Sequence, residues 1–494
     1  MSSGWEAVIG LEVHAQLLTR SKLFCPCSTR YGAPPNTHVC PVCIGLPGAL
    51  PVPNRGAIEL AIRAALALGC TVREHSRFAR KGYFYPDLAK GYQISQYELP
   101  LSEHGTLSLA VDGETVVARI RRIHVEEDAG KNVHGTYGDA TLVDFNRAGV
   151  PLIEIVGDPD LRSAAQAEEY LVRLREVLMF VGVNDGNLEE GSFRCDANVS
   201  VRPRGSDVLG TRCEVKNINS FRFVRKALEH EIARQAAVVA AGGTIRQETL
   251  HWSEALGKTV PLRGKEEAQD YRYFPDPDLP PLHVAPAWVE RVRSAMPELP
   301  ADKRARYATE LGLTTYDAEV LTSHPGIAVF FEAAAGEGSL LGVAPKTVAN
   351  FVQSLLKRDL MKPLLSGEVN RLASIAHDLV VPPREIARLV ALVARGTISN
   401  RQANDVLAEM ESSGRGAEAV VAALGLRQES DESALRAILE KVVAGNEAQA
   451  AKLRAGKSGV RGFFVGAVMR ETSGQANPAV VNRILDEMFG GNAS

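Results

Sequence analysis

The sequence of 494 residues predicts an α+β N-terminal region followed by an all-helical C-terminal region. Two observations on composition support this division. Every cysteine lies at or before Cys213, and every tryptophan lies at or before Trp288. Between Phe351 and Phe463 there is no Phe, Tyr or Trp, and Ala, Leu, Val, Glu and Arg dominate segments of helical length that are broken at Gly and Pro.

Strand and helix signals are interleaved in the N-terminal region. Alternating apolar residues flank Asp112-Gly113 within 106–128, which predicts a β-hairpin, and 151–158 predicts another strand. A helix is expected within 160–183, because its leucines and valines recur at helical spacing and Ser163 can cap its start.

About two to four domains are expected, because single hydrophobic cores stop growing near ~250–300 residues. The proline-rich stretch 275–288 is expected to be irregular or extended and to close the first domain. The predicted bounds are 1–296 for the α+β domain, 297–412 for a helical domain and 413–494 for an all-α tail domain.

The overall composition is that of a globular protein, with 45% hydrophobic residues, 23% charged residues and a net charge of −3. This balance argues against a strongly basic nucleic-acid binder but allows a local basic face. The apolar stretches contain charges and fall short of the ~20 residues of a membrane span. The first residues lack the basic start and cleavage site of a signal peptide, so we expect a cytoplasmic protein with reduced cysteines.

Four of the seven cysteines form two close pairs, Cys25-x-Cys27 and Cys40-x2-Cys43, joined by a turn-rich loop of twelve residues. Two such pairs can close a tetrahedral thiolate site around Zn²⁺. Because sulfur fills all four positions, none stays open for water or substrate, and a structural zinc is expected. Four unrelated reduced thiols are the alternative. The other cysteines are expected to pack as small apolar residues: Cys70, Cys195 and Cys213.

Carboxylates and a histidine from three segments predict a second metal site. Glu12 and His14 are two residues apart in GLEVH, so on a strand they share one face. Glu126 follows a strand signal in HVEEDAGK, where the next two residues are also acidic and are alternative candidates. Glu154 lies inside an apolar strand, where a lone acid is costly to bury unless it is paired, protonated or bound to a cation. Together these four side chains suit Mg²⁺. A surface Glu, a packed His and a structural salt bridge are the simpler alternatives.

Neither common phosphate-binding loop is present, since we find no G-x-x-x-x-G-K-[ST] and no G-x-G-x-x-G after a strand. The metal and scattered cationic side chains are then expected to hold phosphates. The stretch 80–98 mixes such cations with aromatic residues, as a nucleotide or tRNA-end pocket does. A turn-rich surface hairpin is the alternative there. Polar residues alternate in 189–203, and further polar residues precede a helix start near 220 that can hold an anion. The candidate nucleotide or substrate contacts are Lys81, Tyr83, Lys90, Arg194, Asp196, Asn198 and Lys216.

Seven segments in chain order resemble successive motifs of the GatB family, the B subunits of the bacterial aspartyl/glutamyl-tRNA(Asn/Gln) amidotransferases: GLEVHAQL, KGYFYPDLAKGYQISQYE, HVEEDAGK, LIEIV, EEGSFRCDANVSVRP, VKNINSF and DYRYFPDPDLPPL. The stretch 456–485 resembles the tail of the same family. The resemblance covers nearly the whole chain and is specific, because several long motifs coincide in order.

The resemblance implies a ligase. In that family, the B subunit uses ATP and Mg²⁺ to phosphorylate the side-chain carboxylate of Glu or Asp mis-attached to tRNA. Ammonia then displaces the phosphate to give Gln-tRNA(Gln) or Asn-tRNA(Asn). The implied fold is an N-terminal cradle resembling glutamine synthetase, followed by helical and tail domains that grip the tRNA. The implied partners are the glutaminase (amidase) A subunit, a small C subunit that completes a heterotrimer, the tRNA, and as a further candidate the cognate aminoacyl-tRNA synthetase.

Carried over to this sequence, the catalytic Mg²⁺ ligands of the family fall on Glu12, His14, Glu126 and Glu154. Its zinc clamp falls on Cys25, Cys27, Cys40 and Cys43. Contacts with tRNA phosphates are expected in 448–470, which has basic residues and no acidic one, with a solvated helix face as the alternative. The candidates in this stretch are Lys452, Arg454, Lys457 and Arg461.

Two other functions fit parts of the sequence. A non-catalytic tRNA-binding scaffold would have no need of the four proposed Mg²⁺ ligands. A free-standing ATP-dependent ligase for a small carboxylate would have no need of a tail that grips tRNA. The sequence contains no Gly-Gly-Ser-Ser amidase signature, so the glutaminase is expected on a second polypeptide.

Overall fold

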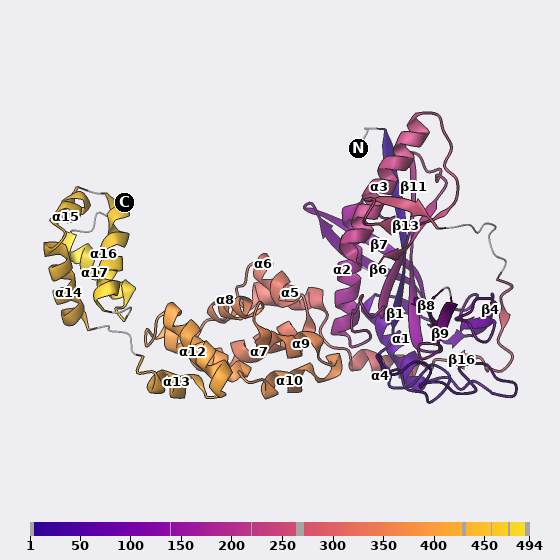
Figure 1. Ribbon diagram of the computed structural model, residues 1–494, viewed down its shortest axis with the longest axis horizontal. Coiled ribbons are helices and arrows are strands. Elements are labelled where there is room, and N and C mark those ends of the chain that lie inside the picture. Colours follow the sequence, from indigo (N-terminus) through magenta and orange to yellow (C-terminus); the bar gives the residue numbers. More distant parts are fainter. Residues whose placement is uncertain are drawn as a thin grey trace. The chain divides into compact units, whose positions relative to one another are not determined.

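The computed structural model describes residues 4–138, 140–218, 220–262, 271–426, 431–455, 457–472 and 475–489. The chain forms two compact units, Met1–Asp302 and Lys303–Ser494. The first unit combines strands and helices around a large sheet, and the described part of the second is helical (Figure 1). The predicted order of a mixed α/β region followed by a helical region is therefore confirmed.

The first unit is built on a nine-stranded sheet. All neighbouring strands in it are antiparallel except β12 and β13, which run parallel. In order across the sheet the strands are β14 (Lys258–Pro261), β13 (Thr249–Ser253), β12 (Cys213–Ile218), β11 (Phe193–Pro203), β1 (Trp5–Gln16), β10 (Pro151–Gly157), β7 (Glu114–Glu127), β6 (Ser102–Val111) and β2 (Thr71–Val72).

The predicted hairpin is confirmed as β6 and β7. Asp112 and Gly113 form its turn with φ angles of 53° and 82°. A two-residue turn with both φ angles positive matches the right-handed twist of the flanking strands, and Asp-Gly is a favoured pair for it. The strand expected within 151–158 is also confirmed, as β10.

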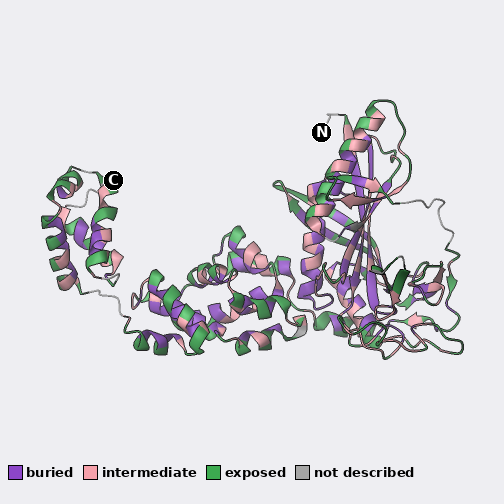
Figure 2. Ribbon diagram, viewed as in Figure 1, coloured by how far each residue is buried: buried purple, intermediate pink, exposed green. Residues whose placement is uncertain are grey.

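Three helices cover one face of this sheet: α1 (Arg55–Ala67), α2 (Ala164–Phe180) and α3 (Phe221–Ala240) (Figure 1). The predicted cap of α2 is confirmed, since Ser163 accepts a hydrogen bond from the Gln166 amide. The strands present apolar residues such as Val13, Ile155 and Ile123 to the same core as these helices. Figure 2 accordingly shows the central strands mostly as buried. Because side chains alternate along a strand, the residues between them lie on the opposite face, which we call the polar face.

Short strands surround the polar face. β15 (Phe274–Pro275), β4 (Ala79–Gly82) and β5 (Tyr92–Ser95) form one small sheet. β16 (Leu282–His283) pairs with β3 (His75–Ser76), and β8 (Lys131–Tyr137) pairs with β9 (Ala140–Asp144). The stretch expected to be irregular or extended, 275–288, begins at the last residue of β15, includes β16 and ends in the first residues of α4 (Pro286–Ser294).

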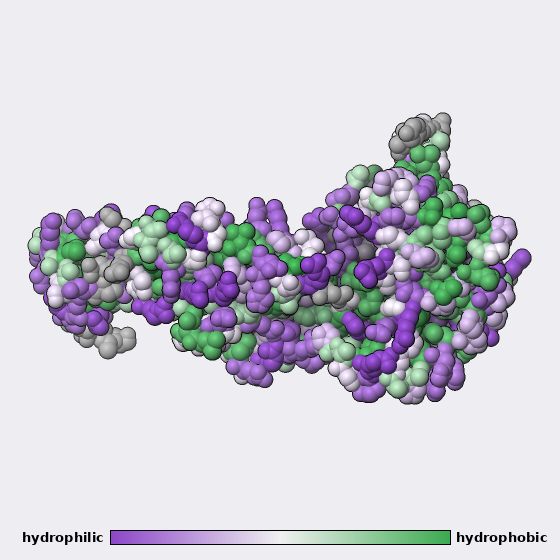
Figure 3. Space-filling view, turned by 90° about the horizontal axis from the view of Figure 1, so that it is seen from below, coloured by the Kyte–Doolittle hydropathy of each residue, from purple (hydrophilic) through white to green (hydrophobic). Residues whose placement is uncertain are grey.

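The remaining helices belong to the second unit, except that the first three residues of α5 (Pro300–Thr309) precede its start at Lys303. The first group is α5, α6 (Thr315–Leu321), α7 (Pro325–Leu340), α8 (Pro345–Leu355), α9 (Lys362–Ser366), α10 (Leu372–Asp378), α11 (Pro383–Ala394), α12 (Asn400–Ser413) and α13 (Ala417–Ala423), with short 3₁₀ turns at Asp359–Met361 and Val369–Arg371. The second group is α14 (Glu432–Ala444), α15 (Glu447–Arg454), α16 (Arg461–Glu471) and α17 (Pro478–Phe489), with a 3₁₀ turn at Ser458–Val460. Polar and apolar side chains are interspersed on the visible face of these helices (Figure 3).

Each of these two helical groups has its own hydrophobic core. The first core includes Ala417, Val420 and Val421 of α13. The second core runs from Leu435 to Leu485. The domain boundary expected after residue 412 would therefore separate α13 from the first hydrophobic core, in which α13 packs. Gly414, which ends α12 in the left-handed region at φ 66°, marks the end of a helix there and not the end of a domain.

Within the described ranges, no helix combines the length and the apolar character needed to cross a membrane.

Candidate active site

Four polar side chains form a row across the centre of the polar face. His124 on β7 lies opposite Glu154 on β10, Glu154 lies opposite His14 on β1, and His14 lies opposite Arg194 on β11. Side chains at directly opposed positions of an antiparallel pair lie on the same face and close together. The strand register thus assembles these groups from four separate parts of the sequence.

Three of the four predicted Mg²⁺ ligands come together at this row. The His14 Nε2 atom lies 3.8 Å from Glu126 Oε1 and 3.6 Å from Glu154 Oε2. Their potential ligand atoms all lie within 4.8 Å of one another. Two carboxylates and one imidazole at this separation fit a divalent cation, and the predominance of oxygen suits Mg²⁺.

The charges of this group are set by its neighbours. Burial opposes ionisation of Glu154, but the contacts with His124 and His14 outweigh burial and hold its pKa well below the usual range. The pKa of Glu126 is lowered in the same way, against burial, mainly by its hydrogen bond with His124. Both carboxylates are therefore ionised near neutral pH, which is the form that binds a cation.

Glu12 stands beside this group and not within it. It lies opposite Asp196 in the register, and its Oε1 atom accepts a hydrogen bond of 3.1 Å from Asn198 Nδ2. Burial raises the pKa of Glu12, and the nearby carboxylates of Glu154 and Glu214 raise it further. A second carboxylate-rich region thus adjoins the first on the same face.

His124 is a site residue that we did not predict. Its Nε2 atom lies 3.2 Å from Glu154 Oε2 and 3.5 Å from Glu126 Oε2. Burial opposes its protonation, but these two carboxylates outweigh burial and raise the pKa of His124 to about 9. The signal was available, because His124 and Glu126 are two residues apart on a strand, as Glu12 and His14 are.

The three consecutive acids of HVEED have three different environments. Glu126 accepts a hydrogen bond of 3.0 Å from Ser95 and faces His14, whereas Glu127 forms a buried ion pair with Lys90. Asp128 accepts bonds of 2.8 Å from Gln16 Nε2 and from Arg194 Nη2. Of the three, Glu126 is the one that the structure groups with His14 and Glu154.

A cavity of about 970 Å³ opens on the polar face. Of the predicted Mg²⁺ ligands and nucleotide or substrate contacts, those that line it are His14, Glu126, Lys81, Tyr83, Arg194, Asp196 and Lys216. Those that do not line it are Glu12, Glu154, Lys90 and Asn198. The volume is sufficient for a small-molecule or nucleotide ligand.

The cations around this cavity differ in how they are paired. Lys216 Nζ lies 3.3 Å from Asp196 and 3.0 Å from Glu214, and Arg194 is bonded to Asp128. Among the described residues Lys81 forms no ion pair, and its Nζ atom lies 4.7 Å from the centre of the Tyr271 ring. Burial opposes its charge, but its electrostatic interactions, the largest of them with the Glu126 carboxylate, outweigh burial and raise the pKa of Lys81. Lys81 is therefore a charged group available to an anionic ligand.

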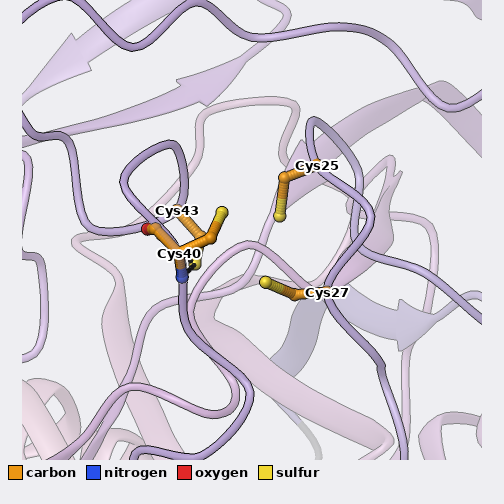
Figure 4. A group of neighbouring side chains, drawn as sticks. All are labelled: Cys25, Cys27, Cys40 and Cys43. Carbon is orange, nitrogen blue, oxygen red and sulfur yellow. Dashed lines mark hydrogen bonds between the residues drawn. The ribbon is translucent and has the colours of Figure 1, made fainter.

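The four clustered cysteines converge, with all four sulfur atoms within 4.8 Å of one another (Figure 4). A hydrogen bond from Cys25, the backbone amide of Cys40 and the ammonium of Lys22 lower the pKa of Cys43 to about 4, against the effect of burial. Four convergent sulfurs fit a closed tetrahedral zinc site. The other three cysteines are buried apart from this cluster, as predicted: Cys70, Cys195 and Cys213.

The loop between the two cysteine pairs forms part of the cavity wall. Its residues 29–33 line the cavity. Asn36 Nδ2 donates a hydrogen bond of 3.0 Å to the Val143 carbonyl, and Asn146 Nδ2 donates one of 2.7 Å to the Pro34 carbonyl. The cysteine cluster therefore flanks a segment that shapes the cavity.

The basic residues predicted in the tail fall into two classes. Arg454 pairs with Glu447 at 2.6 Å, and Arg461 pairs with Asp486. Lys452 and Lys457 are exposed, and within the described ranges neither forms an ion pair. The two lysines are thus the tail cations most readily available to phosphate.

Comparison with known families assigns both units. The family described as the GatB/GatE catalytic domain matches residues 7–290, and the family described as the GatB domain matches residues 329–489. These matches cover the sheet unit with its cavity and most of the helical unit.

Curated relatives are similar over nearly the full length. The chain is 52% identical over 493 residues to the B subunit of the aspartyl/glutamyl-tRNA(Asn/Gln) amidotransferase of Anaeromyxobacter dehalogenans (strain 2CP-1 / ATCC BAA-258), covering 99% of each chain. It is 53% identical over 490 residues to the protein of the same name from Geotalea uraniireducens, covering 99% of this chain and all of the relative. For the relative of that name from Myxococcus xanthus, the identity is 50% over 488 residues, with 99% of each chain covered.

Proposed function

The chain belongs to the GatB family of amidotransferase B subunits, and on that premise we propose that it activates and amidates the side-chain carboxylate of Glu-tRNA(Gln), Asp-tRNA(Asn) or both. It is an enzyme component of the ligase class, part of a glutamine-hydrolysing amidotransferase. ATP supplies the activating phosphate in this proposal.

The chemistry requires activation because a carboxylate is a poor electrophile. In the proposed sequence a carboxylate oxygen of the substrate attacks the γ-phosphorus of ATP, and ADP leaves. Ammonia then attacks the acyl carbon of the resulting acyl phosphate, and inorganic phosphate leaves with the oxygen that came from the carboxylate. Phosphoryl transfer of this kind depends on positioning and on neutralisation of phosphate charge.

The residues of the polar face fit these requirements. His14, Glu126 and Glu154 would hold Mg²⁺, which when bound draws phosphate oxygens together and offsets their charge. Lys81 and Arg194 line the same cavity and would bind phosphate oxygens. His124 bonds both carboxylates and would keep them oriented. Tyr83, Asp196 and Lys216 line the remaining cavity wall and are proposed substrate contacts.

The strongest support for an enzyme is the convergence of His14, Glu126 and Glu154 beside a cavity that also carries cationic groups. A tRNA-binding scaffold would have no need of two carboxylates and a histidine grouped beside such a cavity. A free-standing ligase would not need the additional helical core at residues 435–489.

Further parts of the proposal concern the surroundings of the site. We propose that the sheet unit is a cradle similar to glutamine synthetase and that the four-cysteine cluster holds a structural zinc. Ammonia would come from the glutaminase A subunit, with a small C subunit completing a heterotrimer in the cytoplasm. The tail would bind tRNA phosphates, and the cognate synthetase is a further proposed partner.

Reconstitution tests the proposed reaction. The chain together with its amidase partner is expected to amidate Glu-tRNA(Gln) or Asp-tRNA(Asn) only when ATP and Mg²⁺ are present, with ammonium chloride able to replace glutamine. The measurement is the amount of Gln or Asn released from the tRNA after deacylation. Amidation that continues without ATP would contradict the proposed activation step, and the same mixture without this chain is the control.

A further inference from the structure

Lys22 is fully buried beside the cysteine cluster, with no exposed side-chain surface. Its Nζ atom lies 2.7 Å from the His38 carbonyl, 3.2 Å from the Phe145 carbonyl and 3.5 Å from Cys43 Sγ. Its backbone amide donates a hydrogen bond of 2.9 Å to the Cys27 carbonyl. One residue therefore contacts both cysteine pairs and the loop between them.

Among the described residues, no carboxylate lies within ion-pair distance of the buried Lys22 ammonium. A buried cation without an opposite charge is costly, and carbonyl oxygens alone provide only dipoles. Of the three atoms that Lys22 Nζ contacts, only the sulfur of Cys43 can carry a full negative charge.

The charge of a closed cysteine site explains this arrangement. Four thiolates and one Zn²⁺ sum to a formal charge of −2, so such a centre stays anionic after the metal binds. A cationic hydrogen-bond donor beside one sulfur offsets part of the negative charge on that ligand. Partners of this kind commonly tune the affinity for the metal. The contact between Lys22 and Cys43 therefore compensates the positive charge of the lysine and part of the negative charge of the centre.

We propose that Lys22 is the counter-cation of the four-cysteine zinc centre and joins that centre to the cavity wall. This inference rests on the zinc clamp of the proposed function. Through the His38 carbonyl, Lys22 holds the end of the loop whose residues 29–33 line the cavity. Through the Phe145 carbonyl, it holds the segment in which Asp144, Asn146 and Arg147 line the cavity.

Close packing at Gly149 supports a specific contact between Lys22 and Cys43. Gly149 has a φ angle of +85°, and a Cβ atom added there would lie 3.4 Å from both Lys22 Cδ and Cys43 Cβ. The Gly149 carbonyl accepts a hydrogen bond of 2.8 Å from the Leu23 amide, which fixes its backbone against this contact. The backbone thus comes close to the pair at a position whose conformation favours glycine.

The test compares zinc release from the full-length K22M variant and the wild-type chain. Methionine keeps an unbranched side chain of similar length but removes the charge. The expected result is that K22M transfers zinc to a chelating dye about 10- to 100-fold faster than the wild-type protein. R20M removes the same charge two residues away at an exposed position and is expected to release zinc at the wild-type rate. C40S removes a ligand and serves as the reference for loss of the centre.

Thermal unfolding with and without zinc separates the proposal from a purely structural role. K22M is expected to lower the melting temperature of the zinc-loaded protein more than that of the chelated protein. If K22M lowers the melting temperature of the zinc-loaded and the chelated protein equally, Lys22 only bonds carbonyls and the proposal is wrong. Zinc release by K22M at the wild-type rate would also overturn the proposal. If K22M does not fold, K22R and K22Q are compared, and equal zinc retention by these two would reject the charge-based role. Absence of zinc from the purified wild-type protein would instead refute the clamp itself.

Discussion

Replacing Glu154 with glutamine is expected to slow ammonia-dependent amidation by at least about 100-fold, because it removes a proposed Mg²⁺ ligand while keeping the side-chain shape. The loss also leaves His14 and His124 with only one of the two carboxylates that both contact, that of Glu126. The measurement is the initial amidation rate as a function of Mg²⁺ concentration, with the partner amidase present. A shift of the Mg²⁺ dependence to higher concentration is expected along with the lower rate.

The matched control for this variant is E114Q. Glu114 is exposed at the start of β7, the strand that carries Glu126, so its replacement tests the same chemical change away from the site. Circular dichroism should show both variants folded. Amidation by E154Q at the wild-type rate and with the wild-type Mg²⁺ dependence would mean that the proposed metal site is wrong.

Removal of the chain after Leu426 is expected to raise the KM for aminoacyl-tRNA at least about tenfold, because it removes the proposed contacts with tRNA phosphates. The KM should also depend less steeply on salt concentration, because each lost phosphate contact no longer releases counterions. The cut spares α13, which packs in the first helical core, and removes α14–α17, which have a separate core. Hydrolysis of glutamine by the partner amidase serves as a control that the complex still assembles.

A finer variant tests which tail residues carry the effect. Replacing Lys452 and Lys457 together by alanine should reproduce part of the loss in the salt slope, because neither pairs with an acid in the described part of the chain. Replacing Arg454, which is paired with Glu447, should change it less. An unchanged KM and salt dependence after the truncation would show that the tail does not bind tRNA.

Local sequence patterns predicted most components of the site, though not His124, and they did not predict the order of these residues in space. The two-residue spacing of Glu12 and His14 correctly placed both on one face of a strand. The row that joins His124, Glu154, His14 and Arg194 depends on strand register between segments that are far apart in the chain. Spacing within one segment carries no information about that register.

The sequence also did not indicate which charged residues pair with one another when they lie far apart in the chain. Lys90 was expected to contact a nucleotide, yet the structure pairs it with Glu127, in a motif that begins more than thirty residues later. Lys22 carried no local signal, because its partners are two carbonyls and a sulfur from other segments. Burial of such groups is decided by tertiary packing, which a local pattern does not report.

Transfer of ¹⁸O tests the central claim most directly. Glu-tRNA(Gln) or Asp-tRNA(Asn) labelled with ¹⁸O in the side-chain carboxylate is incubated with the complex, ATP, Mg²⁺ and ammonia, and the inorganic phosphate is examined by mass spectrometry. Activation through an acyl phosphate predicts that each amide formed places one carboxylate oxygen in the released phosphate. Amide formation accompanied by unlabelled phosphate would contradict phosphorylation of the substrate carboxylate.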